Sequence, residues 1–504
     1  MKFTNDRILK LVRHYRKISL LGEVRGVLSW DLEVNLPEKG ADGRGVQSAY
    51  LAGLAVDLWL DRDFRRDLEY LLEHGRGLGR EERAVLRNLE RGSKYYWRVP
   101  KELVEEESKT TSEAFVAWRK ARENDNFGVF LPYLKKILEL QRRVAGHLGY
   151  EKNPYQALVE LYEPEARVEW YEKIFEGLRV ELVSLLGKIK KSKKYREEKS
   201  EKGGDYPRQD QEQVAKFVLK RMGYDFGAGR MDVAPHPFTT ELGRFDVRVT
   251  NRYNETDFRD SLTAVMHEGG HALYEQGVNE DLEGTALGGG VSLGIHESQS
   301  RFWENQVGRN PAFIRFLTPV LQAFYSKELG AKDWQFVSEC LNQVRPSLIR
   351  VEADEVTYNL HIMLRFELEN RLLKSSLRVR DLPEAWRAGM KKYLGVVPET
   401  EREGVLQDVH WAHGSFGYFP TYTLGNLYAA QFASKMQEEV NLEKCLEVGN
   451  LGEILAWQRE KIHQWGSLYW PQELIKRVTG EELNSKYFLA YLKEKYGRIY
   501  SLKK

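Results

Sequence analysis

The sequence predicts a mainly α-helical fold with one small β-ribbon. Apolar residues recur at helical spacing along most of the 504 positions, beginning with Ile8, Leu11 and Tyr15 on one face of residues 4–21. Only residues 244–252 alternate convincingly at period two, after the turn-rich segment 223–240. Helical periodicity on both sides of a single strand-like segment indicates a helical protein rather than an α/β one.

Local sequence signals mark the ends of several expected helices. Thr4 or Asn5 can cap the first, and Pro100 fits the first turn of a long acidic one ending near 123. Residues 28–37 read as a loop, and the glycines at 75–79 separate two helices. The expected helices cover 4–21, 42–75, 80–94, 100–123, 129–148, 165–190, 207–222, 261–275, a segment around 296–304, 344–373 and most of 427–504.

Composition excludes several classes of function. Lys and Arg number 77 against 75 acidic residues, so the net charge of +2 favours neither nucleic acid nor an anionic membrane as the main partner. The lysine-rich segment 188–205 interleaves glutamates and is typical of a solvated loop. Two cysteines, no signal-peptide core and no long apolar run predict a cytoplasmic protein without a membrane span.

The sequence HEGGH at positions 267–271 carries the clearest chemistry. On a helix, His267 and His271 lie four residues apart and project from one face. Two imidazoles at this spacing can bind a zinc-like ion, with Glu268 beside it as a general base. The apolar flanks suggest that the helix is buried, where histidines need partners. The paired glycines cost roughly 1 kcal/mol each, which suggests that a substrate or another backbone approaches closely.

A catalytic zinc site needs a third protein ligand and an open position. The position that carries a histidine in the longer HExxHxxGxxH motif is Gly277 here, so that class is excluded. A glycine-rich run at 288–290 leads into a helix with His296 and Glu297, and we favour Glu297 as the third ligand. Glu275 and His296 are the alternatives, and His296 better suits a role beside a ligand or the substrate.

Three other segments hold candidate substrate-binding residues. His236 lies between two prolines before the ribbon, which suits a positioned group. Arg350 lies in an apolar stretch and is either paired, for which Asp354 four residues on is a candidate, or held for a carboxylate. Residues 404–426 combine histidines and tyrosines with glycines, and such donors can stabilise an oxyanion.

Six motifs together resemble the carboxypeptidase Taq family of metallocarboxypeptidases. They occur in the family's order and cover nearly the full chain: HPF at 236–238, DxRxT at 246–250, HExxH at 267–271, HESQ at 296–299, IRxxAD at 349–354 and GxxQDxHW at 404–411. The resemblance implies two helical halves around a deep cleft, as in neurolysin, with residues 1–504 forming one catalytic unit. It also implies a thermostable homodimer with zinc or cobalt, which removes single residues from peptide C-termini with broad specificity.

The resemblance also assigns roles to residues outside the metal motif. His410 and Tyr422 are the expected oxyanion donors, with Tyr418 a near rival for the tyrosine role. Arg350 is the expected anchor for the substrate's terminal carboxylate, and Arg248 is the second choice. An oligoendopeptidase of the same architecture, without a carboxylate anchor, is the main alternative. A helical scaffold with a structural metal is weaker, because Glu268 would have no role.

Overall fold

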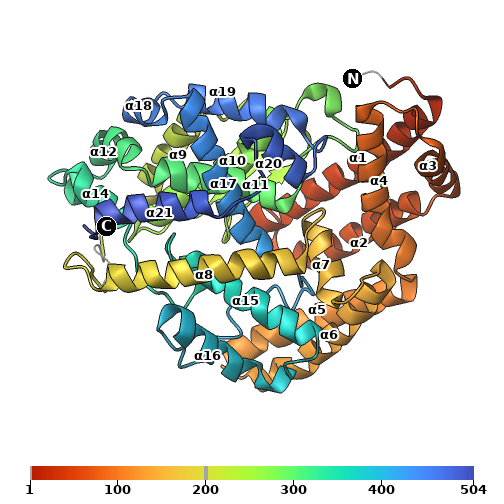
Figure 1. The fold of residues 1–504 in the computed structure, drawn as a ribbon, viewed down its shortest axis with the longest axis horizontal. Coiled ribbons are helices and arrows are strands. Elements are labelled where there is room, and N and C mark those ends of the chain that lie inside the picture. Colours follow the sequence, from red (N-terminus) through yellow and green to blue (C-terminus); the bar gives the residue numbers. More distant parts are fainter. Residues whose placement is uncertain (1–2, 198–202, 504) are drawn as a thin grey trace. The chain divides into compact units, whose positions relative to one another are not determined.

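The computed structural model describes residues 3–197 and 203–503. Helices dominate this part of the chain (Figure 1), which confirms the predicted fold class. The chain forms two compact units, each built from separated segments. The first comprises Met1–Trp97, Glu201–Leu341 and Tyr428–Leu483, and the second comprises Arg98–Ser200, Asn342–Leu427 and Asn484–Lys504.

The first unit is organised around one buried helix, α10, which carries the HEGGH motif. Helices α9 and α11 pack against α10. Its α-helices are α1 (Asp6–Val34), α2 (Ala41–Trp59), α3 (Arg62–His74), α4 (Arg80–Arg98), α9 (Arg208–Met222), α10 (Phe258–Gly277), α11 (Leu293–Arg301), α12 (Pro311–Phe324), α13 (Ser326–Leu329), α14 (Trp334–Leu341), α18 (Leu442–Glu447), α19 (Gly452–Lys461) and α20 (Pro471–Thr479), together with most of α17 (Pro420–Glu439).

The second unit is organised around α15, which packs against α6, α7, α8 and α16. The long helix α8 runs beside α21 (Figure 1). The helices of this unit are α5 (Lys101–Glu123), α6 (Phe127–Leu148), α7 (Pro154–Tyr162), α8 (Val168–Lys190), α15 (Tyr358–Leu373), α16 (Leu382–Leu394), α21 (Lys486–Ile499) and the first turns of α17. Across the two units, short 3₁₀ helices lie at Glu38–Gly40, Glu280–Leu282, Arg350–Glu352, Val379–Asp381 and His463–Trp465. A π-helix, η3, lies in the first unit at Phe302–Gly308.

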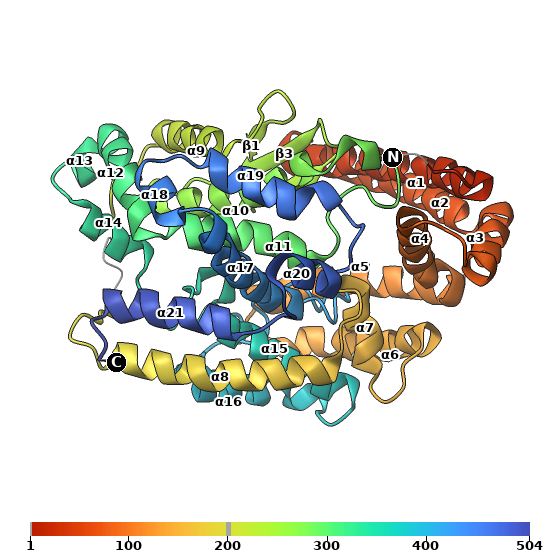
Figure 2. The same ribbon diagram turned by 45° about the horizontal axis from the view of Figure 1, so that its top comes forward.

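The predicted β-ribbon is a three-stranded sheet in the first unit. Its strands are β1 (Met231–Val233), β2 (Thr239–Glu241) and β3 (Val247–Asn251), in the order β1-β3-β2. The central strand β3 pairs in parallel with β1 and antiparallel with β2. Figure 2 shows β1 and β3 near α1, and β2 and β3 both contact α10. The sheet therefore lies against the motif helix.

Several helix boundaries differ from the predictions. Residues 28–34 continue α1 instead of forming a loop, and the predicted helix 42–75 breaks at Leu60-Asp61, where the Asp61 side chain caps α3. Helix α7 was missed, although Asn153 caps it and Pro154 occupies its first turn. The helix expected from 344 begins only at Tyr358.

Two predictions about the whole chain can also be compared with the structure. Cys340 and Cys445 are both buried, and neither forms a disulfide. Within residues 3–197 and 203–503, no helix is both long and apolar enough to cross a membrane. The lysine-rich segment begins at the end of α8 and continues as turns, and its residues 198–202 lie outside the described residues.

Candidate metal and catalytic site

Helix α10 places both motif imidazoles on one face. Asp257 caps the helix, with its carboxylate accepting from the Arg259 amide at 3.1 Å. Because the two histidines are one turn apart, their ring centroids lie 5.0 Å from each other. Both side chains are half-buried. The helix itself is largely buried, as its apolar flanks predicted.

The glycine pair in the motif lets two neighbouring helices approach α10. A Cβ atom on Gly270 would lie 2.6 Å from the backbone of Gln299 and Ser300 in α11. A Cβ atom on Gly269 would lie 2.8 Å from the Met222 side chain of α9. The predicted close approach of another backbone is therefore real, and Gly270 is the residue that permits it.

Glu297 on α11 faces both imidazoles. Its Oε2 lies 3.6 Å from His267 Nε2 and 3.5 Å from His271 Nε2. These distances exceed those of ordinary hydrogen bonds. They match the edge of a tetrahedron, about 3.4 Å, around an ion with nitrogen and oxygen ligands at about 2.0–2.2 Å. The three donor atoms therefore fit one divalent metal ion, which agrees with their mutual separations of under 4.8 Å.

A second carboxylate holds His267 from its other side. Glu304 Oε2 lies 2.9 Å from His267 Nδ1. Glu304 belongs to the π-helix Phe302–Gly308, which directly continues α11. Arg301 donates to Glu297 Oε1 at 2.7 Å and to Glu304 Oε2 at 3.1 Å. This arrangement places the proton of the neutral imidazole on Nδ1 and leaves the Nε2 lone pair for a metal.

His271 has an outer partner of a different kind. Its Nδ1 faces His296 Nδ1, and His296 Nε2 lies 2.9 Å from Glu275 Oε1. The Gly290 amide also donates to Glu275 Oε1, at 2.9 Å. His296 and Glu275, the two alternatives to Glu297, are therefore placed behind His271 rather than beside the other two donor atoms.

The protonation states of His271 and Glu297 suit a metal site. Burial lowers the pKa of His271 to about 3, which keeps this imidazole neutral. Burial would raise the pKa of Glu297, but Arg301 and His267 hold it well below its ordinary value. Burial would lower the pKa of His267, but Glu297 and Glu304 raise it. The carboxylate charge is thus preserved in the interior, where a cation is the natural counter-charge.

Glu268 is buried beside this group and tied to the sheet. The Thr239 hydroxyl on β2 lies 2.8 Å from Glu268 Oε2 and 2.9 Å from the Glu268 backbone oxygen. Glu268 is 8% exposed, and burial raises the pKa of its carboxyl group. A raised pKa brings a carboxylate closer to the basicity that a general base needs near neutral pH.

Arg350, in the second unit, belongs to a buried charge cluster. It donates to Asp408 Oδ1 at 3.0 and 2.8 Å and to the Tyr358 hydroxyl at 3.2 Å. Arg365 pairs with the other oxygen of Asp408 at 2.6 Å. The predicted pairing of Arg350 with Asp354 is wrong, because the Asp354 side chain instead accepts backbone amides before α15.

His410 and both candidate tyrosines lie close together in the second unit. His410 Nε2 is 3.3 Å from the Tyr422 hydroxyl. The Tyr418 ring centroid lies 5.4 Å from the His410 ring and 5.3 Å from the Tyr422 ring. Burial, aided by the charges of Arg350, lowers the pKa of His410 to about 3, so its imidazole is neutral.

The two remaining candidates are in the first unit, outside the metal group. Arg248 donates to both oxygens of Asp246 at 2.7 Å and stacks on Trp30, with its guanidinium carbon 4.4 Å from the ring centroid. These contacts account for Arg248 structurally. His236 is exposed on the bend between β1 and β2.

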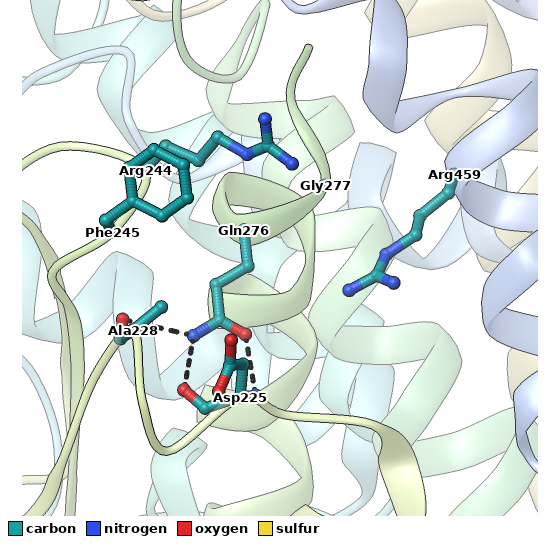
Figure 3. A pocket seen from close by; sticks show the side chains of 7 residues that line it. All are labelled: Asp225, Ala228, Arg244, Phe245, Gln276, Gly277 and Arg459. Carbon is teal, nitrogen blue, oxygen red and sulfur yellow. Dashed lines mark hydrogen bonds between the residues drawn. The ribbon is translucent and has the colours of Figure 1, made fainter. Parts of the chain in front are cut away.

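A cavity of about 250 Å³ lies at the C-terminal end of α10 (Figure 3). The buried Gln276 amide donates to the backbone oxygens of Asp225 and Ala228 there, at 3.0 and 3.2 Å. The guanidinium groups of Arg244 and Arg459 lie on either side of this glutamine (Figure 3). The cavity contains none of the predicted catalytic residues. Its lining is Asp225, Ala228, Arg244, Phe245, Gln276, Gly277 and Arg459.

The sequence did not predict several residues that contact the metal-site residues or Arg350. Glu304 follows Glu297 by two helical turns, a spacing that could have indicated a shared face. The π-helix that places Glu304 beside His267 has no such signal. Thr239 lies in a strand of only three residues, and Asp408 lies far along the chain from both arginines that it binds.

Comparison with known proteins agrees with this geometry. A model of the carboxypeptidase Taq (M32) metallopeptidase family matches residues 10–496. Thermostable carboxypeptidase 1 of Pyrococcus furiosus is 43% identical over 502 residues, covering 98% of this chain and 99% of the relative. Carboxypeptidase 1 of Bacillus subtilis is 37% identical over 503 residues, covering 98% of each.

Solved structures give the same result. The Pyrococcus furiosus carboxypeptidase matches with a TM-score of 0.96 and 43% identity, covering 98% of this chain and 99% of that one. Metallocarboxypeptidase 1 of Trypanosoma cruzi matches with a TM-score of 0.93 and 36% identity, covering 97% and 99%. The chain therefore belongs to the carboxypeptidase Taq (M32) family of metallopeptidases and is a metallocarboxypeptidase.

Proposed function

We propose that this metallocarboxypeptidase removes single residues from peptide C-termini with broad specificity, using Glu268 as general base. The observation that carries the proposal is the triangle of His267, His271 and Glu297 donor atoms beside the buried Glu268 carboxylate. Zinc is the proposed resident ion, with cobalt as a functional substitute, since imidazole and carboxylate ligands suit both.

His267 Nε2, His271 Nε2 and Glu297 Oε2 would hold the ion. When bound, it supplies a Lewis acid that acidifies water and polarises a carbonyl group. Thr239 holds Glu268 Oε2, so Glu268 Oε1 is the atom that takes a proton from the attacking water. Glu268 then passes this proton to the leaving amine.

Residues of the second unit recognise the substrate. Arg350 and Arg365 share the Asp408 carboxylate. We assign Arg350 to the peptide's terminal carboxylate, which a guanidinium group can bind with two parallel hydrogen bonds. His410 and Tyr422 donate hydrogen bonds to the developing oxyanion, and Tyr418 is the alternative tyrosine.

The secondary candidates have narrower roles. Within residues 3–197 and 203–503, the only strand that pairs with β2 is β3, along one edge. The other edge of β2 can align an extended peptide beside Glu268 by backbone pairing. We assign His236 to the same peptide, because it lies on the bend that leads into this strand. Arg248 remains the second choice for the carboxylate, although Asp246 already holds it.

The test is mass spectrometry of a free-acid peptide incubated with the enzyme. We expect a ladder of single losses from the C-terminus, which chelator abolishes and zinc or cobalt restores. Glu268→Gln should bind metal at the wild-type level without producing a ladder. Internal cleavage, as an oligoendopeptidase would give, or full turnover by Glu268→Gln would refute the proposal.

The remaining features follow from the family resemblance. We propose that residues 1–504 act as one catalytic unit, which the span of the family model supports. We also propose a thermostable, cytoplasmic homodimer. Light scattering gives the oligomeric state and calorimetry the thermal midpoint. A monomer, or unfolding at mesophilic temperatures, would reject the corresponding statement.

A further inference from the structure

A row of buried polar residues on α15 faces the segment that carries His410. His361, Arg365 and Glu369 follow one another at intervals of four, and all three are 0% exposed. At this spacing, their side chains lie on one face of the helix. Arg365 binds the start of the segment, donating to Gln407 Oε1 at 2.8 Å and to Asp408 Oδ2 at 2.7 Å.

Glu369 binds the rest of the segment. Trp411 Nε1 donates to Glu369 Oε1 at 2.8 Å, and the Gly417 amide donates to Glu369 Oε2 at 3.0 Å. The Tyr155 hydroxyl of α7 also donates to Oε2, at 2.6 Å. The Glu369 carboxylate thus accepts two hydrogen bonds from residues 411–417 and one from the neighbouring helix α7.

The attachment points adjoin the proposed catalytic groups. Trp411 directly follows His410, and Gly417 directly precedes Tyr418. Gly417 has φ of +92°, and its amide donates to the carboxylate from this left-handed conformation. A Cβ atom there would lie 2.8 Å from the α7 backbone. The segment can therefore take this path only with glycine at position 417. The Glu369 carboxylate accepts the hydrogen bond from the amide of this glycine.

This arrangement is costly for stability alone. Glu369 is fully buried, and its three hydrogen-bond donors are all neutral. Burial raises its pKa to about 7. Replacing buried ionised groups with apolar residues of similar volume is often neutral or stabilising. The role of Glu369 is therefore better explained by the geometry that its hydrogen bonds impose on residues 411–417.

We propose that Glu369 is a positioning residue, which fixes residues 410–418 so that His410 and the adjoining tyrosine are aligned for the reaction. The inference rests on the proposed function of His410 as an oxyanion donor. Glu369 itself is not proposed to contact the substrate. Its action requires two acceptor oxygens, one directed at Trp411 and one at Gly417.

Glu369→Gln is the matched test, because glutamine keeps the size but has one acceptor oxygen. In either orientation of the amide, its NH₂ group faces a loop donor. A misplacement on the order of 1 Å can cost about 100-fold in rate. We expect kcat to fall about 10- to 100-fold, while KM for free-acid peptides changes less than about threefold, because Arg350 stays in place.

Tyr155→Phe is the control, because it removes the donor that lies outside the segment. We expect it to leave kcat unchanged, even if it lowers the thermal midpoint. Trp411→Phe removes one segment donor and provides a second test should Glu369→Gln fail to fold. It should lower kcat in the same direction, and its effect should not add to that of Glu369→Gln.

Hydrogen exchange separates this inference from the proposed function. The Gly417 amide should exchange slowly in the wild type and faster in Glu369→Gln, whether or not peptides are cleaved. If the wild type gives no C-terminal ladder, the proposed function is rejected. The exchange result then still tests whether Glu369 holds residues 410–418 in place. Unchanged exchange, unchanged kcat in Glu369→Gln, or an equal fall in Tyr155→Phe would overturn the inference.

Discussion

Removing Arg350 tests its assignment to the peptide's terminal carboxylate. Arg350 is 7% exposed and Arg365 is 0% exposed, and both bind Asp408. Among the residues that the structure describes, no other carboxylate pairs with either guanidinium. In Arg350→Met, Asp408 and Arg365 remain as a balanced pair, so no unpaired charge is buried. The loss of folding stability should be about 1–2 kcal/mol, the value of the hydrogen bonds removed.

The effect on catalysis should be larger. Truncating one partner of a buried charge pair costs about 2–5 kcal/mol. Taking 2–4 kcal/mol, kcat/KM for a free-acid peptide should fall by roughly 30- to 1,000-fold. The matched peptide amide carries no charge at its C-terminus, so its kcat/KM should change by less than about threefold.

The assay compares kcat/KM for a blocked dipeptide acid and its amide, in the wild type and in Arg350→Met. Arg402→Met is the control, because Arg402 is an exposed arginine of the same unit. It should leave the ratio of acid to amide unchanged. An equal loss on both peptides in Arg350→Met would show that the arginine supports the fold of the site rather than the substrate's carboxylate.

Three further outcomes follow from the site. Glu304→Gln should weaken metal affinity about 10- to 100-fold, as measured by competition with a chelator, because it loosens His267; unchanged affinity would contradict this role. Metal removal should lower the thermal midpoint, and saturation at 100 times Kd should restore about 2.7 kcal/mol of stability; an unchanged midpoint would contradict a metal site formed by folding. Because the pKa of His410 is lowered from 6.5 to about 3, the contribution of this residue to stability should fall as pH drops below 6.5, by about 2 kcal/mol at pH 5. His410→Gln should flatten this slope in thermal melts between pH 7 and 5, and a slope equal to the wild type would contradict the assignment.

The parts of the site that the sequence predicted are those specified by local spacing. His267 and His271 share a face wherever a helix forms. The two glycines between them cost helix stability, which indicated that a substrate or another backbone approaches closely. Glu297 was favoured because a glycine-rich run leads into its helix, and the structure brings its carboxylate to both imidazoles.

The parts that the sequence did not predict depend on contacts between distant segments or on irregular backbone. Asp354 was the candidate partner if Arg350 were paired, but the acidic group that reaches Arg350 is Asp408, 58 positions away. Asp354 was already occupied by amides before α15. A short acidic side chain near a helix start serves as a cap as readily as an ion-pair partner, and sequence spacing alone does not distinguish the two.

The π-helix after α11 shows why an irregular segment belongs at this site. A π-helix forms hydrogen bonds between residues five apart rather than four, and such turns occur frequently at functional sites. Here Arg301 ends α11, and Glu304 lies in the first turn of the π-helix. Arg301 binds Glu297 with one nitrogen and Glu304 with another. One continuous segment thus presents two carboxylates to opposite nitrogens of His267.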